Sequence, residues 1–230
     1  MTQYTTHYAQ RAMEQEKNRQ QIEKKRDHVA KLTGAHTTDP IKDYKVVRQW
    51  LKIAEEHDAN RQRGGVSWYM LLILGFNTSL RIGDICALRV KDVRDQERVR
   101  VIAEKTGKLS YIKLQADVQK RINRLLAGRG DDEYILQSRQ RGGKTGDVKP
   151  ISRQRAFAII KEIAARAGFQ EHAGCHTMRK TFAYELYQTT GDLSLVQKVL
   201  NHSSQMETLR YIGLDQMAVD KAIDNMHRMI

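Results

Sequence analysis

The chain has 230 residues, of which 40% are hydrophobic and 29% charged, and this balance excludes a disordered chain and fits a globular protein with one sizeable core. The sequence has no run of about 18 apolar residues, so it predicts no membrane span, and residues 1–10 lack the apolar stretch of a secretory signal. We therefore expect a cytoplasmic protein with no membrane partner. Lys and Arg number 40 against 27 Asp and Glu, a formal net charge of +13 at pH 7; this fits either a polyanionic partner such as nucleic acid or an ordinary basic protein.

Residues 1–38 differ from the rest of the chain. They are polar, with too few large apolar side chains for a firm buried stripe, and they predict a solvated helix or a flexible basic arm. Residues 39–230 form the predicted main domain. We expect it to open with a helix capped by Asp39, with Pro40 in the first turn, and from Ile41 apolar residues recur at the spacing of an amphipathic helix.

The next segments alternate between polar breaks and apolar helices. Residues 61–65 form a polar break, and residues 68–76 are nearly all apolar, which predicts a buried helix. After an interruption at 77–79, residues 81–88 predict another helix.

An antiparallel hairpin is predicted next. Apolar and polar residues alternate over 99–103 and again over 112–114, on either side of a turn at 106–107. A helical period follows over 117–126.

The second half of the chain is mainly helical by the same criteria. Helical periods cover 152–167 and the segment from His176 to the C-terminus, whereas the glycine-containing segment 137–149 predicts a mobile loop. The predicted fold is therefore mainly α with a small antiparallel β-sheet, an α+β architecture.

The chain has two cysteines, Cys86 and Cys175. They are able to form one disulfide, but we expect free thiols because a cytoplasm is reducing. The sequence has no Cys-x-x-Cys pair, and its eight histidines do not cluster at zinc-ligand spacings. It therefore predicts no metal and no cofactor.

Five places carry polar residues in unusual settings. Each has a structural explanation when taken alone: an ion pair one helical turn apart, a solvated hairpin lysine, a structural His–Arg pair, a helix-end histidine or a core tyrosine. In chain order they are Arg81 with Asp84, Lys105, His176 with Arg179, His202, and Tyr211.

Together, the order and spacing of these residues resemble the phage integrase, or tyrosine recombinase, family. The residues that carry the resemblance are Leu80-Arg81-Ile-Gly-Asp84-Ile, a hairpin lysine, His176-Thr-Met-Arg179, Leu200-Asn-His202 and then Tyr211. The resemblance covers roughly residues 39–215, the family's catalytic domain. It implies catalytic roles for six residues, which are Arg81, Lys105, His176, Arg179, His202 and Tyr211.

The reaction that this resemblance implies is the cutting and rejoining of double-stranded DNA. The tyrosine attacks the phosphorus and forms a 3′-phosphotyrosyl link with release of a 5′-hydroxyl, and the 5′-hydroxyl of a second strand reverses the step. Integration, inversion and resolution of DNA all use this chemistry. A free tyrosine has a pKa near 10 and is a poor nucleophile, so it needs a base or cationic surroundings.

The charged residues suit such a reaction. Without a metal, fixed donors must meet the charge that develops on the phosphate oxygens, and guanidinium groups such as those of Arg81 and Arg179 bind phosphate oxygens in a planar fork. We expect Lys105 to protonate the leaving 5′-oxygen, with Lys108 as the rival. Asp84 is expected to support Arg81.

The roles of the two histidines depend on the geometry of the site. His176 is expected to help remove the proton of Tyr211, and His202 to donate to a phosphate oxygen. Two departures from the family pattern leave the catalytic groups in place. Lys180 stands where many relatives carry a second histidine, and Asn201 stands where glycine is commoner.

The ends of the chain bear on assembly. Most relatives carry an N-terminal helical domain that clamps DNA, and residues 1–38 are too short and polar to replace it, so we expect a short member or one that needs an accessory DNA-binding protein. Residues 214–230 predict a terminal helix with an apolar stripe that includes Val219 and Ile223. In relatives such a helix docks on a neighbouring subunit, which implies a homotetramer on DNA.

Two alternatives remain open from the sequence. One is a DNA-binding regulator that keeps the fold without the activity, and the other is a type IB topoisomerase-like or telomere-resolving enzyme.

Overall fold

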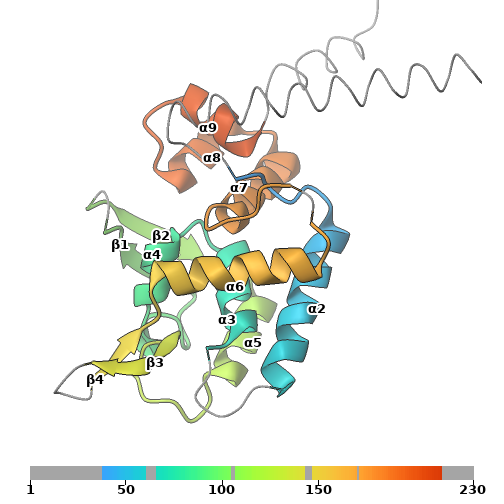
Figure 1. Ribbon diagram of the computed structural model, residues 1–230. Coiled ribbons are helices and arrows are strands. Elements are labelled where there is room, and N and C mark those ends of the chain that lie inside the picture. Colours follow the sequence, from blue (N-terminus) through green and yellow to red (C-terminus); the bar gives the residue numbers. More distant parts are fainter. Residues whose placement is uncertain (1–37, 61–65, 105–106, 143–146, 170, 214–230) are drawn as a thin grey trace, which may run out of the picture. The chain divides into compact units, whose positions relative to one another are not determined.

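The computed structural model describes residues 38–60, 66–104, 107–142, 147–169 and 171–213. The strands described form two separate two-stranded antiparallel sheets. No helix in this part of the chain has both the length and the apolar character needed to cross a membrane. In chain order (Figure 1), the elements are α2 (Tyr44–Asn60), α3 (Trp68–Asn77), α4 (Ile82–Ala87), the 3-10 helix η1 (Val90–Asp92), β1 (Arg98–Ile102), β2 (Leu109–Lys113), α5 (Ala116–Leu125), β3 (Gln137–Gly142), β4 (Asp147–Pro150), α6 (Arg153–Arg166), α7 (Thr177–Thr190), α8 (Leu193–Leu200) and α9 (Gln205–Ile212).

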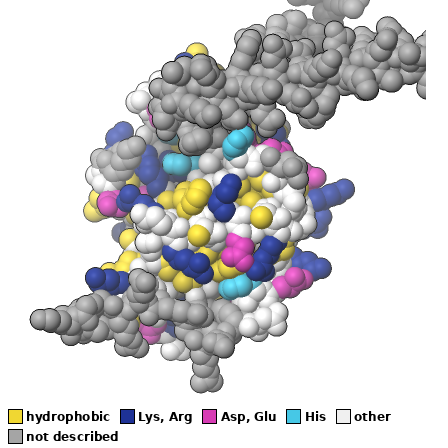
Figure 2. Space-filling model, viewed as in Figure 1, with side chains coloured by type: hydrophobic (Ala, Val, Ile, Leu, Met, Phe, Trp, Pro, Cys, Tyr) yellow, Lys and Arg dark blue, Asp and Glu magenta, His cyan; other side chains and the backbone are white. Residues whose placement is uncertain are grey.

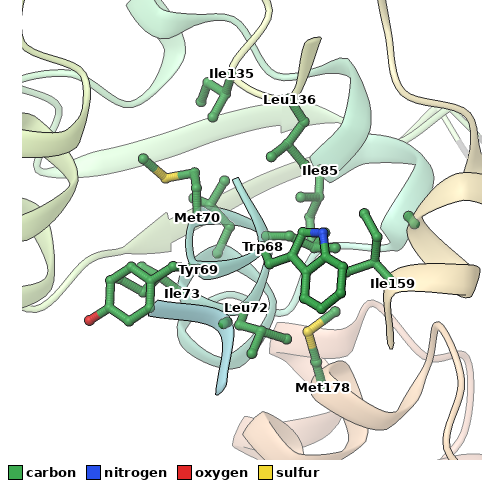
Figure 3. Packing of buried hydrophobic residues seen from close by; sticks show 14 of the residues in the cluster. Trp68, Tyr69, Met70, Leu72, Ile73, Ile85, Ile135, Leu136, Ile159 and Met178 are labelled. Carbon is green, nitrogen blue, oxygen red and sulfur yellow. The ribbon is translucent and has the colours of Figure 1, made fainter. Parts of the chain in front are cut away.

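Helix α3 is the centre of the main hydrophobic core. All residues from Trp68 to Gly75 are buried, because α2, α4, α5 and α7 pack around this helix. Figure 3 shows Trp68 and Met178 among the apolar side chains of this core. The helix starts where Asp58 accepts hydrogen bonds from the backbone of Trp68 at 3.0 Å and of Tyr69 at 3.2 Å. The buried helix predicted over 68–76 is confirmed.

Helix α2 begins later than the sequence predicted. The predicted cap, Asp39, is wrong: the carboxylate of Asp43 accepts from the Lys45 backbone N–H at 2.8 Å. Asp39 instead donates its own backbone N–H to the His172 carbonyl at 3.0 Å. A tertiary contact therefore holds Asp39 outside the helix, and the second aspartate takes over as cap.

The hairpin predicted around residues 99–114 is confirmed. In the β1–β2 pair Val99 lies opposite Ile112, and Val101 lies opposite Ser110. Val99 and Ile112 are buried against the core, so the inner face of the hairpin carries the alternation seen in the sequence.

A second hairpin, β3–β4, replaces the loop predicted over 137–149. Gln137 pairs with Pro150 and Gly142 with Asp147, with an irregular register between. The sequence predicted a loop because the segment is polar and glycine-rich, but backbone hydrogen bonds form a hairpin without an apolar face. None of its residues belongs to the two hydrophobic cores described.

A second, smaller core joins α7, α8 and α9, which pack against one another. Tyr211 lies at its edge, and Met178 in the first turn of α7 belongs to the main core, so α7 connects the two. The buried residues of the smaller core are Ala183, Val196, Leu200 and Ile212.

Candidate active site

Five of the six residues predicted as catalytic lie in the described part of the chain, and Lys105 lies outside it. Each of the five stands at or near the end of a helix. Arg81 directly precedes α4, and His176 is the N-cap of α7, with Arg179 one turn later. His202 follows α8, and Tyr211 is in the last turn of α9.

Local signals explain these helix ends. Ser204 caps α9 by accepting from the Glu207 backbone N–H at 3.1 Å, and this start places Tyr211 two turns later. The Ser79 hydroxyl donates to the Val199 carbonyl at 3.1 Å. This bond ties the segment before Arg81 to the end of α8.

The Tyr211 hydroxyl is the centre of the cluster. Its oxygen lies 3.1 Å from His176 Nδ1, and its ring stands edge-on to the His202 ring, with centroids 4.9 Å apart. Burial raises the pKa of Tyr211 to about 12, while the charge and hydrogen bonding of Arg179 and the charge of Arg81 act in the opposite direction. In this protein without DNA the phenol is therefore protonated at neutral pH.

Arg179 is a buried cation beside this hydroxyl. Its side chain donates to the Leu200 carbonyl at 2.8 Å, and the residue is only 6% exposed. Burial lowers the pKa of Arg179, the charge of Tyr211 opposes this change, and the neighbouring charge of Arg81 adds to it. The two guanidinium groups therefore lie close enough to repel each other.

Arg81 has a different environment. It is half-buried, and its charge lowers the pKa of Tyr211, of Arg179 and of His202, so it lies within electrostatic reach of all three. Among the described residues, its guanidinium has no hydrogen bond or ion pair. An arginine in such a position is able to bind an added anion without breaking an existing contact.

His202 is nearly buried, with 6% of its side chain exposed. Its Nδ1 lies 3.2 Å from the Thr208 hydroxyl, and that hydroxyl donates to the Ser204 carbonyl at 3.1 Å. His202 Nε2 lies 3.9 Å from Glu207 Oε1. Both ring nitrogens therefore have a polar neighbour. Burial lowers the pKa of His202, Glu207 raises it, and both arginines lower it.

Asp84 anchors the hairpin, and its charge also favours the charged form of Arg179 by raising the pKa of that residue. Its Oδ1 accepts from the Glu104 backbone N–H at 3.1 Å, and its side chain is buried. Glu104 directly precedes Lys105, so this bond anchors the chain next to that lysine. The support of Arg81 by Asp84 stays a prediction. Lys108, the rival to Lys105, is exposed.

Two neighbours of the cluster were not predicted as site residues. Lys180 is buried, and its Nζ lies 5.3 Å from the centroid of the Tyr211 ring. The Thr208 hydroxyl orients His202 as described above. The sequence pointed to Lys180 only as a departure from the family pattern, and Thr208 carried no signal because its contact depends on the turn between α8 and α9.

Cys86 and Cys175 are both free thiols. Burial, together with the charge of Cys175, raises the pKa of Cys86 to about 12, and Arg153 acts in the opposite direction. Among the described residues no group of three or more His, Cys, Asp or Glu side chains has a geometry that would hold a metal ion.

The arrangement brings two guanidinium groups and two imidazoles around one phenol. Such a site is able to hold a phosphate diester by charge-assisted hydrogen bonds next to the hydroxyl oxygen. Its one potential proton acceptor within hydrogen-bond distance of that oxygen is the imidazole of His176, among the contacts described.

Comparison with known proteins shows the family of the chain. The model of the phage integrase family matches residues 42–217, which is more than half of the chain. The chain is 36% identical over 181 residues to "Probable integrase/recombinase YoeC" of Bacillus subtilis, covering 79% of this chain and 92% of that protein. It is 29% identical over 157 residues to the tyrosine recombinase XerC of Xanthomonas campestris, covering 68% of this chain but only 47% of that protein. It thus spans nearly all of YoeC and about half the length of XerC.

Solved structures show the same fold. The XerA recombinase superposes with a TM-score of 0.60 at 18% identity, over 84% of this chain and 68% of that one. The catalytic domain of bacteriophage HP1 integrase superposes with a TM-score of 0.52 at 14% identity, over 81% of this chain and 95% of that one. The predicted mainly α fold with a small antiparallel sheet is thereby confirmed. On the family match and the YoeC identity, the chain belongs to the phage integrase family, the tyrosine recombinases.

Proposed function

We propose that this protein is a site-specific DNA recombinase that cuts and rejoins DNA strands through a 3′-phosphotyrosyl intermediate on Tyr211. The observation that carries the proposal is the position of the Tyr211 hydroxyl, 3.1 Å from His176 Nδ1 and within the field of Arg81 and Arg179. A phenol is placed next to a base and two permanent cations, which is what attack on a phosphate diester requires.

In the cleavage step the phosphate occupies the space that the two guanidinium groups face. Arg81 and Arg179 bind its non-bridging oxygens, and His176 accepts the proton of Tyr211 as the phenolic oxygen bonds to phosphorus. The bond from phosphorus to the 5′-oxygen breaks, and Lys105 gives that oxygen a proton. A phosphate diester link is exchanged for another, so no nucleotide triphosphate is consumed.

His202 donates in this scheme to a phosphate oxygen. Its Nδ1 lies 3.2 Å from the Thr208 hydroxyl and its Nε2 lies 3.9 Å from Glu207 Oε1. The negative charge of the bound DNA favours the protonated imidazole.

Double-stranded DNA is the proposed partner. The net charge of +13 supports it, and Figure 2 shows Lys and Arg side chains spread over one face, with Asp and Glu side chains among them. One structural neighbour is a lambda integrase tetramer bound to a Holliday junction, with a TM-score of 0.55.

We propose a homotetramer on DNA that is linked through residues 214–230. An accessory DNA-binding protein is a further proposed partner, and the cytoplasm is the proposed location. Both terminal segments lie outside the described residues: residues 1–37, which make up most of the proposed basic arm, and residues 214–230.

A nicked suicide-substrate assay tests the proposal. The nick lets the short strand diffuse away after cleavage and traps the covalent adduct, and candidate sites are taken from the DNA beside the protein's own gene. We expect adduct with the unaltered chain and none with Tyr211→Phe. Specific binding without cleavage would favour a silent regulator. Relaxation of plasmids without a defined site by a monomer would favour a topoisomerase-like enzyme.

A further inference from the structure

We propose that Asn201 is a positioning residue for the hairpin β1–β2, and that through Ser110 it holds the hairpin's general acid in register with the rest of the site. This inference rests on the proposed function, since it concerns the proton that the leaving 5′-oxygen needs. Asn201 Nδ2 donates to Ser110 Oγ at 3.0 Å, across 91 positions of sequence.

The backbone at Asn201 does not require asparagine. The residue ends α8 in the left-handed conformation, with φ 55° and ψ 37°. Glycine adopts this conformation at the lowest cost, and asparagine is the side chain that tolerates it next best. The amide therefore adds what glycine cannot supply, a hydrogen bond to a distant strand.

The turn at Asn201 is held on both sides, by Arg179 before it and by α8 after it. The carbonyl of Leu200 accepts from Arg179 at 2.8 Å. The backbone N–H of His202 donates to the Gln197 carbonyl at 3.1 Å. The amide of Asn201 thus projects from a rigid corner between two of the proposed catalytic residues.

The acceptor of this hydrogen bond, Ser110, lies near the turn on the face of the hairpin that packs against the core. Ser110 is half-buried and pairs with Val101, next to the turn. The turn is closed by the backbone N–H of Ala103, which donates to the Lys108 carbonyl at 2.9 Å, and by that of Gly107, which donates to the Ala103 carbonyl at 2.8 Å. Lys105 is part of this turn by sequence.

In addition to the burial of Val99 and Ile112, two side-chain hydrogen bonds among the described residues anchor the turn end of the hairpin, one on each side. On the side of β1 the Glu104 N–H is held by Asp84, and Glu104 also pairs with Arg153 of α6. On the side of β2, Ser110 is held by Asn201. The first anchor ties the turn to the helix that follows Arg81, and the second ties it to the corner that carries His202. Without the bond from Asn201 the turn end is still held by Asp84 and by the buried inner face, so we expect a small shift that affects the proton donor more than the arginines.

The experiment compares two suicide substrates, one with the natural 5′-oxygen and one with sulfur at that bridging position. A thiol has a pKa near 8.5, so the thiolate leaves without a proton donor. A variant whose only defect is in the general acid should therefore cleave the sulfur substrate at the rate of the unaltered chain. We expect Asn201→Gly and Ser110→Ala each to slow cleavage of the oxygen substrate by about 10- to 100-fold, the range for a slightly misplaced group. Cleavage of the sulfur substrate should stay within about two-fold of the unaltered chain.

Three further variants make the test specific. Lys105→Ala should show the same rescue by sulfur, Ser110→Thr should keep the hydroxyl and restore cleavage of the oxygen substrate, and Asn201→Gly with Ser110→Ala should be no slower than either change alone. Equal losses on both substrates, or no loss on either, would overturn the positioning role. If the unaltered chain forms no adduct on either substrate, the proposed function itself fails, and that result differs from every outcome in which Tyr211 still forms an adduct.

Discussion

At the scale of the residue, the central feature is the buried phenol of Tyr211, the proposed nucleophile. Burial keeps Tyr211 protonated, while Arg179 and Arg81 favour its ionised form. Because burial has the larger effect, the phenol of Tyr211 is protonated at neutral pH in the protein without DNA. In the proposed reaction, the bound phosphate brings phosphorus into line with this phenol and with its proposed proton acceptor, His176.

This balance predicts the pH dependence of Tyr211 ionisation. With a pKa of about 12, the phenolate forms only well above the ordinary value of 10.0, so at pH 10 about 1% of Tyr211 is ionised where an ordinary tyrosine would be half ionised. The difference in absorbance of phenolate between the unaltered chain and Tyr211→Phe measures it. A difference of half a phenolate at pH 10 would contradict the burial of this group.

The two arginines are predicted to respond differently to removal. Arg81→Ala should slow cleavage by about 10²–10³-fold and change the free energy of unfolding by less than about 0.5 kcal/mol, because the side chain is half-buried and unpaired among the described residues. Arg179→Ala should slow cleavage at least as much and also destabilise the fold by about 1–3 kcal/mol, because the Leu200 carbonyl loses its donor.

Suicide-substrate kinetics and urea denaturation of both variants provide the measurements. Equal stability losses for the two would mean that Arg81 has a structural partner.

At the scale of the element, α7 connects the core to the site. Its first turn carries Arg179 and also Met178, which packs into the main core beside α3. Gly75 of α3 makes this approach close: a Cβ there would lie 2.2 Å from Met178 Sδ and 3.1 Å from its Cβ. The distance between these two helices therefore sets the position of Arg179, one of the residues proposed as catalytic.

Gly75→Ala is predicted to destabilise the protein by about 1–3 kcal/mol through overpacking. Met178 is only 1% exposed, so it has no free space to move into. Helix propensity alone would favour alanine by about 1 kcal/mol, so the sign of the change separates packing from propensity in thermal or urea denaturation.

Two control variants accompany it. In a Met178→Ala background the effect of Gly75→Ala should largely vanish. For Gly83→Ala in α4 the three nearest atoms all belong to the flexible, exposed side chain of Arg153, so this change should be tolerated. A more stable Gly75→Ala protein would show that α3 and α7 are not in tight contact.

The elements also show what the sequence was able to predict. The hairpin β1–β2 was predicted because one of its faces is buried, which makes apolar and polar residues alternate along its strands. The hairpin β3–β4 was missed because none of its residues belongs to either described core. The start of α2 depended on a contact between Asp39 and His172, and such tertiary contacts leave no local pattern.

The same distinction holds for the site. Arg81, His176, Arg179, His202 and Tyr211 were predicted from their order and types, and the structure brings all five together. The bond from Asn201 to Ser110 joins residues 91 positions apart, so the sequence indicated only an unusual residue at the end of a helix.

At the scale of the whole molecule, recombination needs several subunits on two DNA duplexes, whereas cleavage of one strand needs one active site. The proposed coupling helix over 214–230 is needed for recombination between subunits and not for cleavage of a single strand. Its apolar stripe includes Ile223, and Asn225 stands on the opposite face of such a helix.

Ile223→Glu is therefore predicted to separate the two activities. Adduct formation on a single-site suicide substrate should persist, while recombination between two sites should fall by about ten-fold or more, the effect of losing one buried anchor. Asn225→Glu adds the same charge off the stripe and should leave recombination intact. Equal effects of the two changes would argue against docking through this stripe.

The most direct test of the whole account is to locate the covalent bond. The adduct trapped on a nicked site in the presence of a chelator is digested with protease and nuclease, and the peptide that retains a nucleotide is sequenced by mass spectrometry. The account predicts a 3′-phosphonucleotide on Tyr211, and no such peptide from Tyr211→Phe. Attachment to any other residue, or adduct that persists undiminished in Tyr211→Phe, would contradict it.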